Sequence, residues 1–327
     1  MLETLHDNRQ MHSLPDRWIW DFWLVTDGDA YHVFYLQAPR SLGNPDLRHN
    51  AATIGHAVSS DLRTWRTLPD ALGAGDPGSF DDLATWTGSI VRAGDVWMLF
   101  YTGISRREHG RVQRIGAARS SDLVAWERVD GFLLEADPRW YEVSGNGETE
   151  AWRDPWAFRD ERTGRYHLLI TARVNYGPLD GRGVIGHAWS DDLSRWTLGP
   201  PVSQPGEFFH LEVPQTAYIG DRHRLFFCAP EWGHSGVRLG RTGVRREGGT
   251  HYLVADDLLG PYVPEREDFL LGDEVGRHYA GRVVETPDGW MMLAWAQYGP
   301  DGTFAGSISD PMPLHVDAGG QLWLEPA

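Results

Sequence analysis

The sequence lacks several features that mark common classes of protein. It has no lysine, so all 30 of its basic residues are arginine, and 46 acidic residues outnumber them to give a formal charge of −16. No basic patch interleaved with aromatic residues occurs, which argues against nucleic acid and anionic lipid as partners. Because no run of about 18 apolar residues occurs either, we predict no membrane-spanning helix.

Signals for export, disulfides and cofactors are also missing. Residues 1–18, MLETLHDNRQMHSLPDRW, have neither the apolar core nor the small-residue cleavage site of an export signal, so we expect a cytoplasmic protein. Cys228 is the only cysteine and lies in the apolar run LFFCAP, which predicts a buried thiol and excludes an intramolecular disulfide. The histidines show no metal-ligand spacing, and no glycine-rich segment leads from a strand into a helix. We therefore predict neither a metal nor another cofactor.

Aromatic residues, glycine and proline are instead abundant along the whole chain. There are 16 Trp, 11 Tyr, 12 Phe, 38 Gly and 20 Pro, whereas segments of helical periodicity are rare. No linker or shift in composition marks a boundary within the 327 residues. The composition predicts an all-β fold and one domain spanning residues 1–327.

Two sequence patterns recur five times. The first is a short apolar strand after a turn, as in DAYHVFYLQ from Asp29. The second ends in Ser-x-Asp-Leu or a degenerate form of it, as in IGHAVSSDLRTW from Ile54, and its aspartates are Asp61, Asp122, Asp192, Asp256 and Asp310. A repeat of roughly 60 residues accommodates the four short strands of one propeller blade. We predict a single five-bladed β-propeller with blades at roughly 18–70, 84–132, 150–200, 210–265 and 278–325.

The repeated aspartates are expected to be structural. An aspartate side chain can cap the turn between the third and fourth strands of a blade, and the neighbouring Leu and Trp can pack between blades. A catalytic acid is rarely needed five times. Catalytic residues are therefore expected on the first strand of each blade, which lines the central channel of a propeller.

Three of the five predicted inner strands carry a carboxylate at a similar position. Asp21, Asp154 and Glu212 precede the next apolar strand by 10, 12 and 11 residues. Like charges in a confined channel raise one another's pKa, and glycoside hydrolases use such carboxylates as nucleophile or base and as acid. Aromatic residues beside them, among them Trp20 and Tyr279, suit a pocket that covers the apolar face of a sugar.

Four motifs on these strands occur in a recognisable order. They are W-D-x-W at 20–23, W-[ST]-G-S at 86–89, R-D-P at 153–155 and E-x-P at 212–214. The series resembles glycoside hydrolase families 32 and 68 of clan J, the invertases, inulinases and levansucrases, which share a five-bladed propeller. The resemblance implies a retaining hydrolase or fructosyltransferase that acts on β-fructofuranosides, such as sucrose or short fructans, through a covalent glycosyl-enzyme intermediate.

The resemblance also implies a role for each matched residue. Asp21 would be the nucleophile, Glu212 the acid/base and Asp154 the residue that stabilises the transition state. The residues expected to bind the sugar are Trp20, Trp86, Ser89, Arg153, His210 and Tyr279. Levansucrases usually have an acidic residue in place of His210 and an arginine in place of Val213, so an unusual acceptor or substrate is expected.

The residues leave other interpretations open. Arabinan- or xylan-active hydrolases and propeller phosphorylases share the architecture and the set of three acids, and the inverting members place the working carboxylates further apart. A non-catalytic propeller that binds a carbohydrate or a protein would need the channel carboxylates to be dispensable. The sequence predicts a small carbohydrate as ligand and makes no prediction of oligomeric state.

Overall fold

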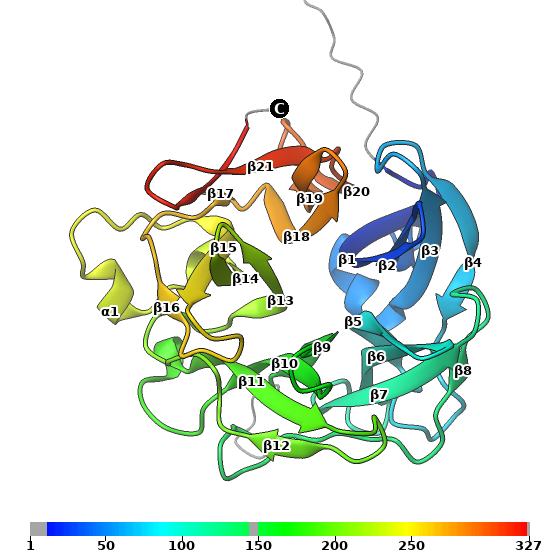
Figure 1. The fold of residues 1–327 in the computed structure, drawn as a ribbon. Coiled ribbons are helices and arrows are strands. Elements are labelled where there is room, and N and C mark those ends of the chain that lie inside the picture. The colour runs from blue at the N-terminus through cyan, green and yellow to red at the C-terminus, as the bar shows by residue number, and fades with distance from the viewer. Residues whose placement is uncertain (1–11, 144–149, 326–327) are drawn as a thin grey trace, which may run out of the picture.

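The computed structural model describes residues 12–143 and 150–325, which form five β-sheets. The sheets stand around a central channel, and the chain passes from one to the next around the ring, from blue to red in Figure 1. The prediction of an all-β, five-bladed propeller is confirmed. No helix among the described residues is long and apolar enough to cross a membrane.

The first three blades contain four strands each, hydrogen-bonded in chain order. Blade 1 consists of β1 (Arg17–Asp27), β2 (Ala30–Pro39), β3 (Thr53–Ser59) and β4 (Arg66–Leu72). Blade 2 consists of β5 (Ala84–Ala93), β6 (Val96–Ile104), β7 (Gln113–Ser120) and β8 (Glu127–Arg128). Blade 3 consists of β9 (Trp152–Arg159), β10 (Tyr166–Arg173), β11 (Gly183–Ser190) and β12 (Thr197–Gly199).

The last two blades each have one additional short strand. Blade 4 consists of β13 (Glu212–Ile219), β14 (Arg222–Ala229), β15 (Gly248–Ala255), β16 (Val263–Pro264) and β17 (Leu271–Asp273). Blade 5 consists of β18 (His278–Thr286), β19 (Gly289–Tyr298), β20 (Phe304–Ile308), β21 (Met312–Val316) and β22 (Leu322–Leu324). β17 pairs with β15, so blade 4 continues past the residue 265 expected from the repeat.

Short helices lie in the loops between the second and third strands of three blades. They are η1 (Arg40–Leu42), η2 (Pro45–Ala51), η3 (Leu179–Gly181), η4 (Glu231–Gly233) and α1 (Gly236–Leu239). The inner strands begin, and the second strands end, on the side where these loops lie. The loops therefore surround one mouth of the channel.

The hydrophobic core lies mainly between neighbouring blades. One apolar cluster joins blades 2 and 3, another blades 3 and 4, a third blades 4 and 5, and the largest draws mainly on blades 1, 2 and 5. The second strands are buried on both faces, which explains why the apolar repeats are the strongest signal in the sequence. Cys228 lies on β14 as a buried free thiol, as predicted.

The turns between the third and fourth strands explain the repeated aspartates. In blade 1, the carboxylate of Asp61 accepts hydrogen bonds from the backbone N–H groups of Arg63 and Thr64 at 2.8 and 2.7 Å. Asp122 and Asp192 accept the corresponding bonds in blades 2 and 3. The leucine after each of these aspartates has a positive φ of 61–64°. The predicted structural role is confirmed for these three blades.

The ring closes between its first and last blades. The backbone of His12 exchanges two hydrogen bonds with Ile308, at 3.0 and 2.9 Å. The guanidinium of Arg40 donates to the carbonyl oxygen of Ala305 at 3.1 Å. Residues near the N-terminus therefore complete the fifth sheet and fix blade 1 against blade 5.

Candidate active site

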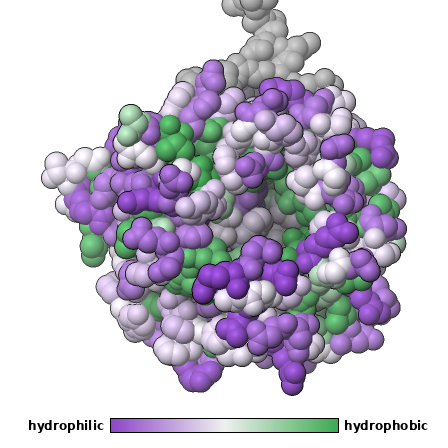
Figure 2. Space-filling view, in the orientation of Figure 1, coloured by the Kyte–Doolittle hydropathy of each residue, from purple (hydrophilic) through white to green (hydrophobic). Residues whose placement is uncertain are grey.

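A pocket of about 540 Å³ opens where the inner strands begin. Each of the five inner strands contributes to its lining, through Asp21, Thr87, Asp154, Glu212 and Tyr279. Figure 2 shows a hollow at the centre of the ring, with mostly hydrophilic residues around it. The three predicted carboxylates therefore converge on one cavity.

Every inner strand is interrupted by a β-bulge at this pocket. The ladder shifts register between Trp20 and Phe22 in β1 and between Trp86 and Gly88 in β5. In β9, β13 and β18 two residues are bulged, and the first of them has a positive φ, which is 55° at Asp154, 54° at Val213 and 49° at Ala280. A bulge suspends the alternation of faces along a strand. Consecutive residues, such as Trp20 and Asp21, therefore both line the pocket.

Asp21 is a half-buried carboxylate held by one hydroxyl. The side chain of Thr87, in the equivalent bulge of blade 2, donates a hydrogen bond to its Oδ2 at 2.9 Å. Burial raises the pKa of Asp21 to about 7, and the nearby charges of Asp154 and Glu212 act in the same direction. Asp21 is thus an acid whose ionised form is stabilised poorly by its surroundings.

Arg153 holds the other two acids. Its guanidinium is ion-paired with Glu212, and its Nε lies 3.6 Å from Oδ2 of Asp154. The Tyr279 hydroxyl donates to Oε2 of Glu212 at 2.5 Å. The ring Nδ1 of His210 lies 3.0 Å from Nη2 of Arg153. These contacts fix the orientation of Glu212 from two sides.

Asp154 is held more rigidly than Asp21. Its Oδ2 accepts hydrogen bonds from the Thr171 hydroxyl at 3.0 Å and from the backbone N–H of Val213 at 3.3 Å. Its own N–H donates to the hydroxyl of Thr102 at 3.0 Å. Burial raises the pKa of Asp154, whereas the neighbouring charge of Arg153 opposes this shift. The contacts fit a residue that binds or stabilises without moving.

A buried arginine beneath the acids was not predicted from the sequence. Arg282, on β18, donates to the carbonyl oxygens of Phe22 at 2.9 Å and Pro214 at 2.7 Å, and lies over the ring of Trp156 at 5.4 Å. Burial lowers the pKa of Arg282 to about 10, while the charges of Asp21 and Asp154 act against that shift. Arg282 therefore joins four blades and places a positive charge below the carboxylates. The sequence feature that could have identified Arg282 is a single arginine in the mostly apolar part of the segment HYAGRVVET.

Most of the residues predicted to bind the sugar line the pocket. Trp20, Trp86, Arg153, His210 and Tyr279 all do so. The indole N–H of Trp86 donates to the backbone carbonyl of His49 at 2.7 Å, which ties blade 2 to the loop of blade 1. Burial lowers the pKa of His210 well below its usual value, so this imidazole is neutral near pH 7.

The structure does not bring Ser89 to the pocket. Its side chain is fully buried, and its hydroxyl accepts a hydrogen bond from the backbone N–H of Ala157 in blade 3 at 2.7 Å. The bulge at Thr87 turns the first two residues of the W-T-G-S motif toward the cavity and leaves Ser89 between blades. Ser89 joins two blades, which differs from the sugar contact expected for it.

The arrangement can perform acid–base and nucleophilic chemistry on an uncharged, hydroxyl-bearing ligand. It combines a carboxylate of raised pKa, a second carboxylate oriented by an arginine and a tyrosine, and aromatic walls. Within the described ranges 12–143 and 150–325, no cluster of three or more His, Cys, Asp or Glu side chains is arranged to hold a metal ion.

Comparison with known proteins places this site in a family. Residues 19–324 match the model described as "Glycosyl hydrolases family 32 N-terminal domain". Sucrose-6-phosphate hydrolase from Bacillus subtilis (strain 168) is 29% identical over 177 residues, 54% of this chain and 33% of that protein. An insoluble β-fructofuranosidase isoenzyme 7 from Oryza sativa subsp. indica is 29% identical over 256 residues, 73% of this chain and 39% of that protein. The chain thus spans less than half the length of these two relatives.

Solved structures show the same fold at lower sequence identity. Inulosucrase from Halalkalicoccus jeotgali bound to kestose has a TM-score of 0.79 and 23% identity, with 95% of this chain and 87% of that chain covered. A Bacillus subtilis levansucrase variant in complex with oligosaccharides has a TM-score of 0.74 and 15% identity, with 99% and 90% covered. Because the family model extends over nearly all of its residues, the chain belongs to glycosyl hydrolase family 32.

Proposed function

We propose that the protein cleaves β-fructofuranosides such as sucrose or short fructans with retention of configuration. The names of two relatives, sucrose-6-phosphate hydrolase and β-fructofuranosidase, agree with this substrate class. We further propose that residues 1–327 act as one catalytic unit, since all three acids and their partners come from this propeller.

In the first step, a carboxylate oxygen of Asp21 attacks the anomeric carbon while the bond to the leaving oxygen breaks. Glu212 gives its proton to that oxygen, so the leaving group departs as a neutral alcohol. In the second step, Glu212 takes a proton from water or a sugar hydroxyl. That oxygen attacks the anomeric carbon and releases Asp21.

The remaining residues would support the charge that develops on the sugar ring. The transition state resembles an oxocarbenium ion, so a fixed carboxylate beside the ring stabilises it. Asp154 suits this role because two hydrogen bonds and the Arg153 guanidinium hold it in place. One observation carries the proposal: Asp21, Asp154 and Glu212 line one pocket together with the arginine that binds two of them.

The test is incubation of the purified protein with sucrose, short fructans and aryl arabinofuranosides, with the products followed by NMR. We expect fructose or a fructosylated acceptor, formed first as the β anomer. Release of fructose with inversion would contradict the retaining mechanism. Release of pentose alone would favour an arabinofuranosidase, and no turnover of any glycoside would favour a binding propeller.

A further inference from the structure

The loop that follows β14 forms part of the pocket mouth above Glu212. In the ladder of blade 4, Glu212 pairs with Cys228, and the chain then leads from Ala229 to Pro230, Glu231 and Trp232. The last three residues all line the pocket. Each extended residue advances the chain by about 3.3 Å, so this segment lies about one sugar ring beyond Glu212 toward the opening. A group that receives a proton from Glu212 would depart on this side.

Trp232 presents an indole to solvent at this mouth. Its side chain is 58% exposed, although it lines the pocket, and the ring of Phe209 lies 5.7 Å away, centroid to centroid. Phe209 in turn lies 4.1 Å below the guanidinium carbon of Arg173. Large exposed aromatic surface beside a pocket marks a binding site, and the flat apolar face of a pyranose can pack on an indole.

Glu231 and Gln297 provide polar groups in the same pocket as the indole. Both side chains line the pocket and are partly buried. Among the residues that the structure describes, neither side chain has a hydrogen bond or an ion pair with another protein group. A partly buried carboxylate and amide without protein partners are suited to the hydroxyl groups of a ligand.

The charges at this mouth favour a neutral ligand. Two arginines line the pocket, Arg48 and Arg153. Arg153 is occupied by Glu212 and Asp154, and Arg48 lies over the rings of blades 1 and 5, 4.7 Å from the centroid of Phe304. A phosphate next to Trp232 would therefore meet the carboxylate of Glu231. Bringing a negatively charged phosphate next to this partly buried carboxylate costs binding free energy.

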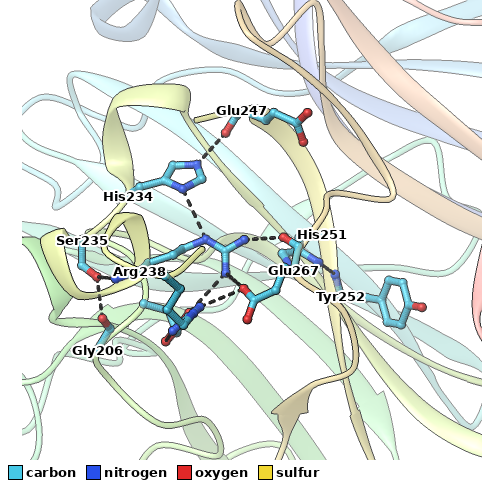
Figure 3. Close-up of polar contacts among 10 residues, drawn as sticks. Gly206, His234, Ser235, Arg238, Glu247, His251, Tyr252 and Glu267 are labelled. Atoms are coloured by element: carbon cyan, nitrogen blue, oxygen red, sulfur yellow. Dashed lines mark hydrogen bonds and ion pairs between the residues drawn. The ribbon is translucent and has the colours of Figure 1, made fainter. Parts of the chain in front are cut away.

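A network of polar side chains around the buried Arg238 holds this loop in place (Figure 3). Arg238, at its centre, donates to Nδ1 of His234 at 3.3 Å and to the carboxylate of Glu267 at 3.0 Å. His234 donates through Nε2 to the carbonyl oxygen of Glu247 at 2.7 Å. Ser235 caps the helix α1 by accepting from the N–H of Arg238 at 3.0 Å. The loop is thus ordered before a ligand binds, which reduces the entropy lost on binding.

We infer that Glu231, Trp232 and Gln297 form the subsite for the leaving or accepting group, and that this subsite selects a neutral sugar ring over a phosphorylated one. The inference rests on the proposed function, because it assumes that a fructosyl unit occupies the deeper part of the pocket. The preferred substrate inferred for this protein therefore differs from sucrose-6-phosphate, the substrate for which one relative is named.

The test compares sucrose, sucrose-6-phosphate and methyl β-fructofuranoside as substrates. The methyl group is too small to reach Trp232, so this third substrate measures the fructosyl chemistry alone. The variants are Glu231→Gln and Trp232→Ala, and Val237→Ala is the control because Val237 is 66% exposed on α1 and does not line the pocket. Thermal melting shows whether each variant folds.

We expect kcat/KM of the unaltered protein to be at least about tenfold higher for sucrose than for sucrose-6-phosphate. Glu231→Gln should reduce that preference about tenfold, since it removes the repulsive charge, and Trp232→Ala should raise the KM for sucrose about tenfold. Neither variant should change turnover of the methyl glycoside, and Val237→Ala should change nothing.

Three results would overturn the inference. These are a preference for sucrose-6-phosphate, an unchanged preference in Glu231→Gln, and an equal loss of methyl glycoside and sucrose turnover in Trp232→Ala. The last would place Trp232 in the fructosyl site. Failure of the proposed function is a different result, namely no turnover of any of the three substrates by the unaltered protein.

Discussion

Aspartates occupy two contrasting environments at opposite ends of the blades. Asp61, in the turn after β3, is exposed, and the backbone N–H groups of Thr64 and Arg63 hold its pKa at about 2. Asp21, in the bulge of β1, is half-buried in the pocket with two other acids, and its pKa is raised to about 7. The turn aspartate recurs in several blades, whereas Asp21 is one of three acids that line the pocket.

The difference shows what decides the role of a carboxylate. Hydrogen bonds to the charged form lower a pKa, and burial beside like charges raises it. At neutral pH the turn aspartate therefore stabilises the fold, whereas ionised Asp21 destabilises it, which agrees with the catalytic role proposed for it. Sequence repetition separates the two sets because turns recur in the blades and reacting groups do not.

The largest effect should come from removing the proposed nucleophile, Asp21. Asp21→Asn keeps the shape of the side chain and its contact with Thr87 but cannot form the glycosyl-enzyme. We expect kcat for sucrose to fall at least about 1,000-fold, as when other enzymes lose a nucleophile. The matched control is Asp61→Asn, which should keep nearly full activity. Similar activities of the two variants would contradict the division between pocket aspartates and turn aspartates.

The same variant should stabilise the protein in a pH-dependent way. Because the pKa of Asp21 is raised from 3.8 to about 7 in the fold, its contribution to stability is present in full below pH 3.8 and is lost as the pH rises through about 7. Asp21→Asn removes that loss. We expect its melting temperature to exceed that of the unaltered protein by about 5 °C at pH 8, and the gain to disappear near pH 4. A gain that does not vary with pH would contradict burial of the charge.

Removal of a turn aspartate should lower the stability of the protein, whereas Asp21→Asn should raise it. Asp61→Ala takes the acceptor from the backbone N–H groups of Arg63 and Thr64. Denaturant unfolding should show a free energy of unfolding lower by about 1 kcal/mol at pH 7, with kcat unchanged. Because the pKa of Asp61 is lowered in the fold, this difference is present above pH 3.8 and shrinks as the pH falls through about 2. A fall in kcat would indicate that the turn acts on the pocket.

The smallest effect is expected at Ser89, which separates a sugar contact from a contact between blades. Ser89→Ala removes the acceptor for the N–H of Ala157, so the free energy of unfolding should fall by about 1 kcal/mol or less. The KM for sucrose should stay within about twofold of the unaltered value, because no sugar hydrogen bond is lost. A clear rise in KM with unchanged stability would restore the role first expected for Ser89.

The sequence allowed the five blades and their inner strands to be predicted because the signals are local. Apolar second strands and Ser-x-Asp-Leu turns recur at regular intervals, and both follow from burial and turn geometry within one blade. The same regularity allowed us to predict that Asp21, Asp154 and Glu212 lie near one level of the channel, and all three line the pocket.

The details of the pocket depend on bulges, which leave little trace in the sequence. Asp21 and Asp154 lie within bulges, whereas Glu212 is the last residue before one and so matches Arg153 in register. Counting residues between strands could not show this difference of one position. Arg282 was missed for a similar reason, because its partners are carbonyl oxygens of other blades that only the closed ring brings together.

The five bulges also have a consequence for how such a protein can change. A bulged residue is not paired in the ladder, so its side chain can be exchanged without altering the hydrogen bonds that hold the sheet. Thr87 in β5, Val213 in β13 and Ala280 in β18 occupy the bulged positions that do not carry an acid. The ring thus separates a constant frame from five bulged positions, and a new specificity can be sought by varying the three without an acid while Asp21 and Asp154 are retained.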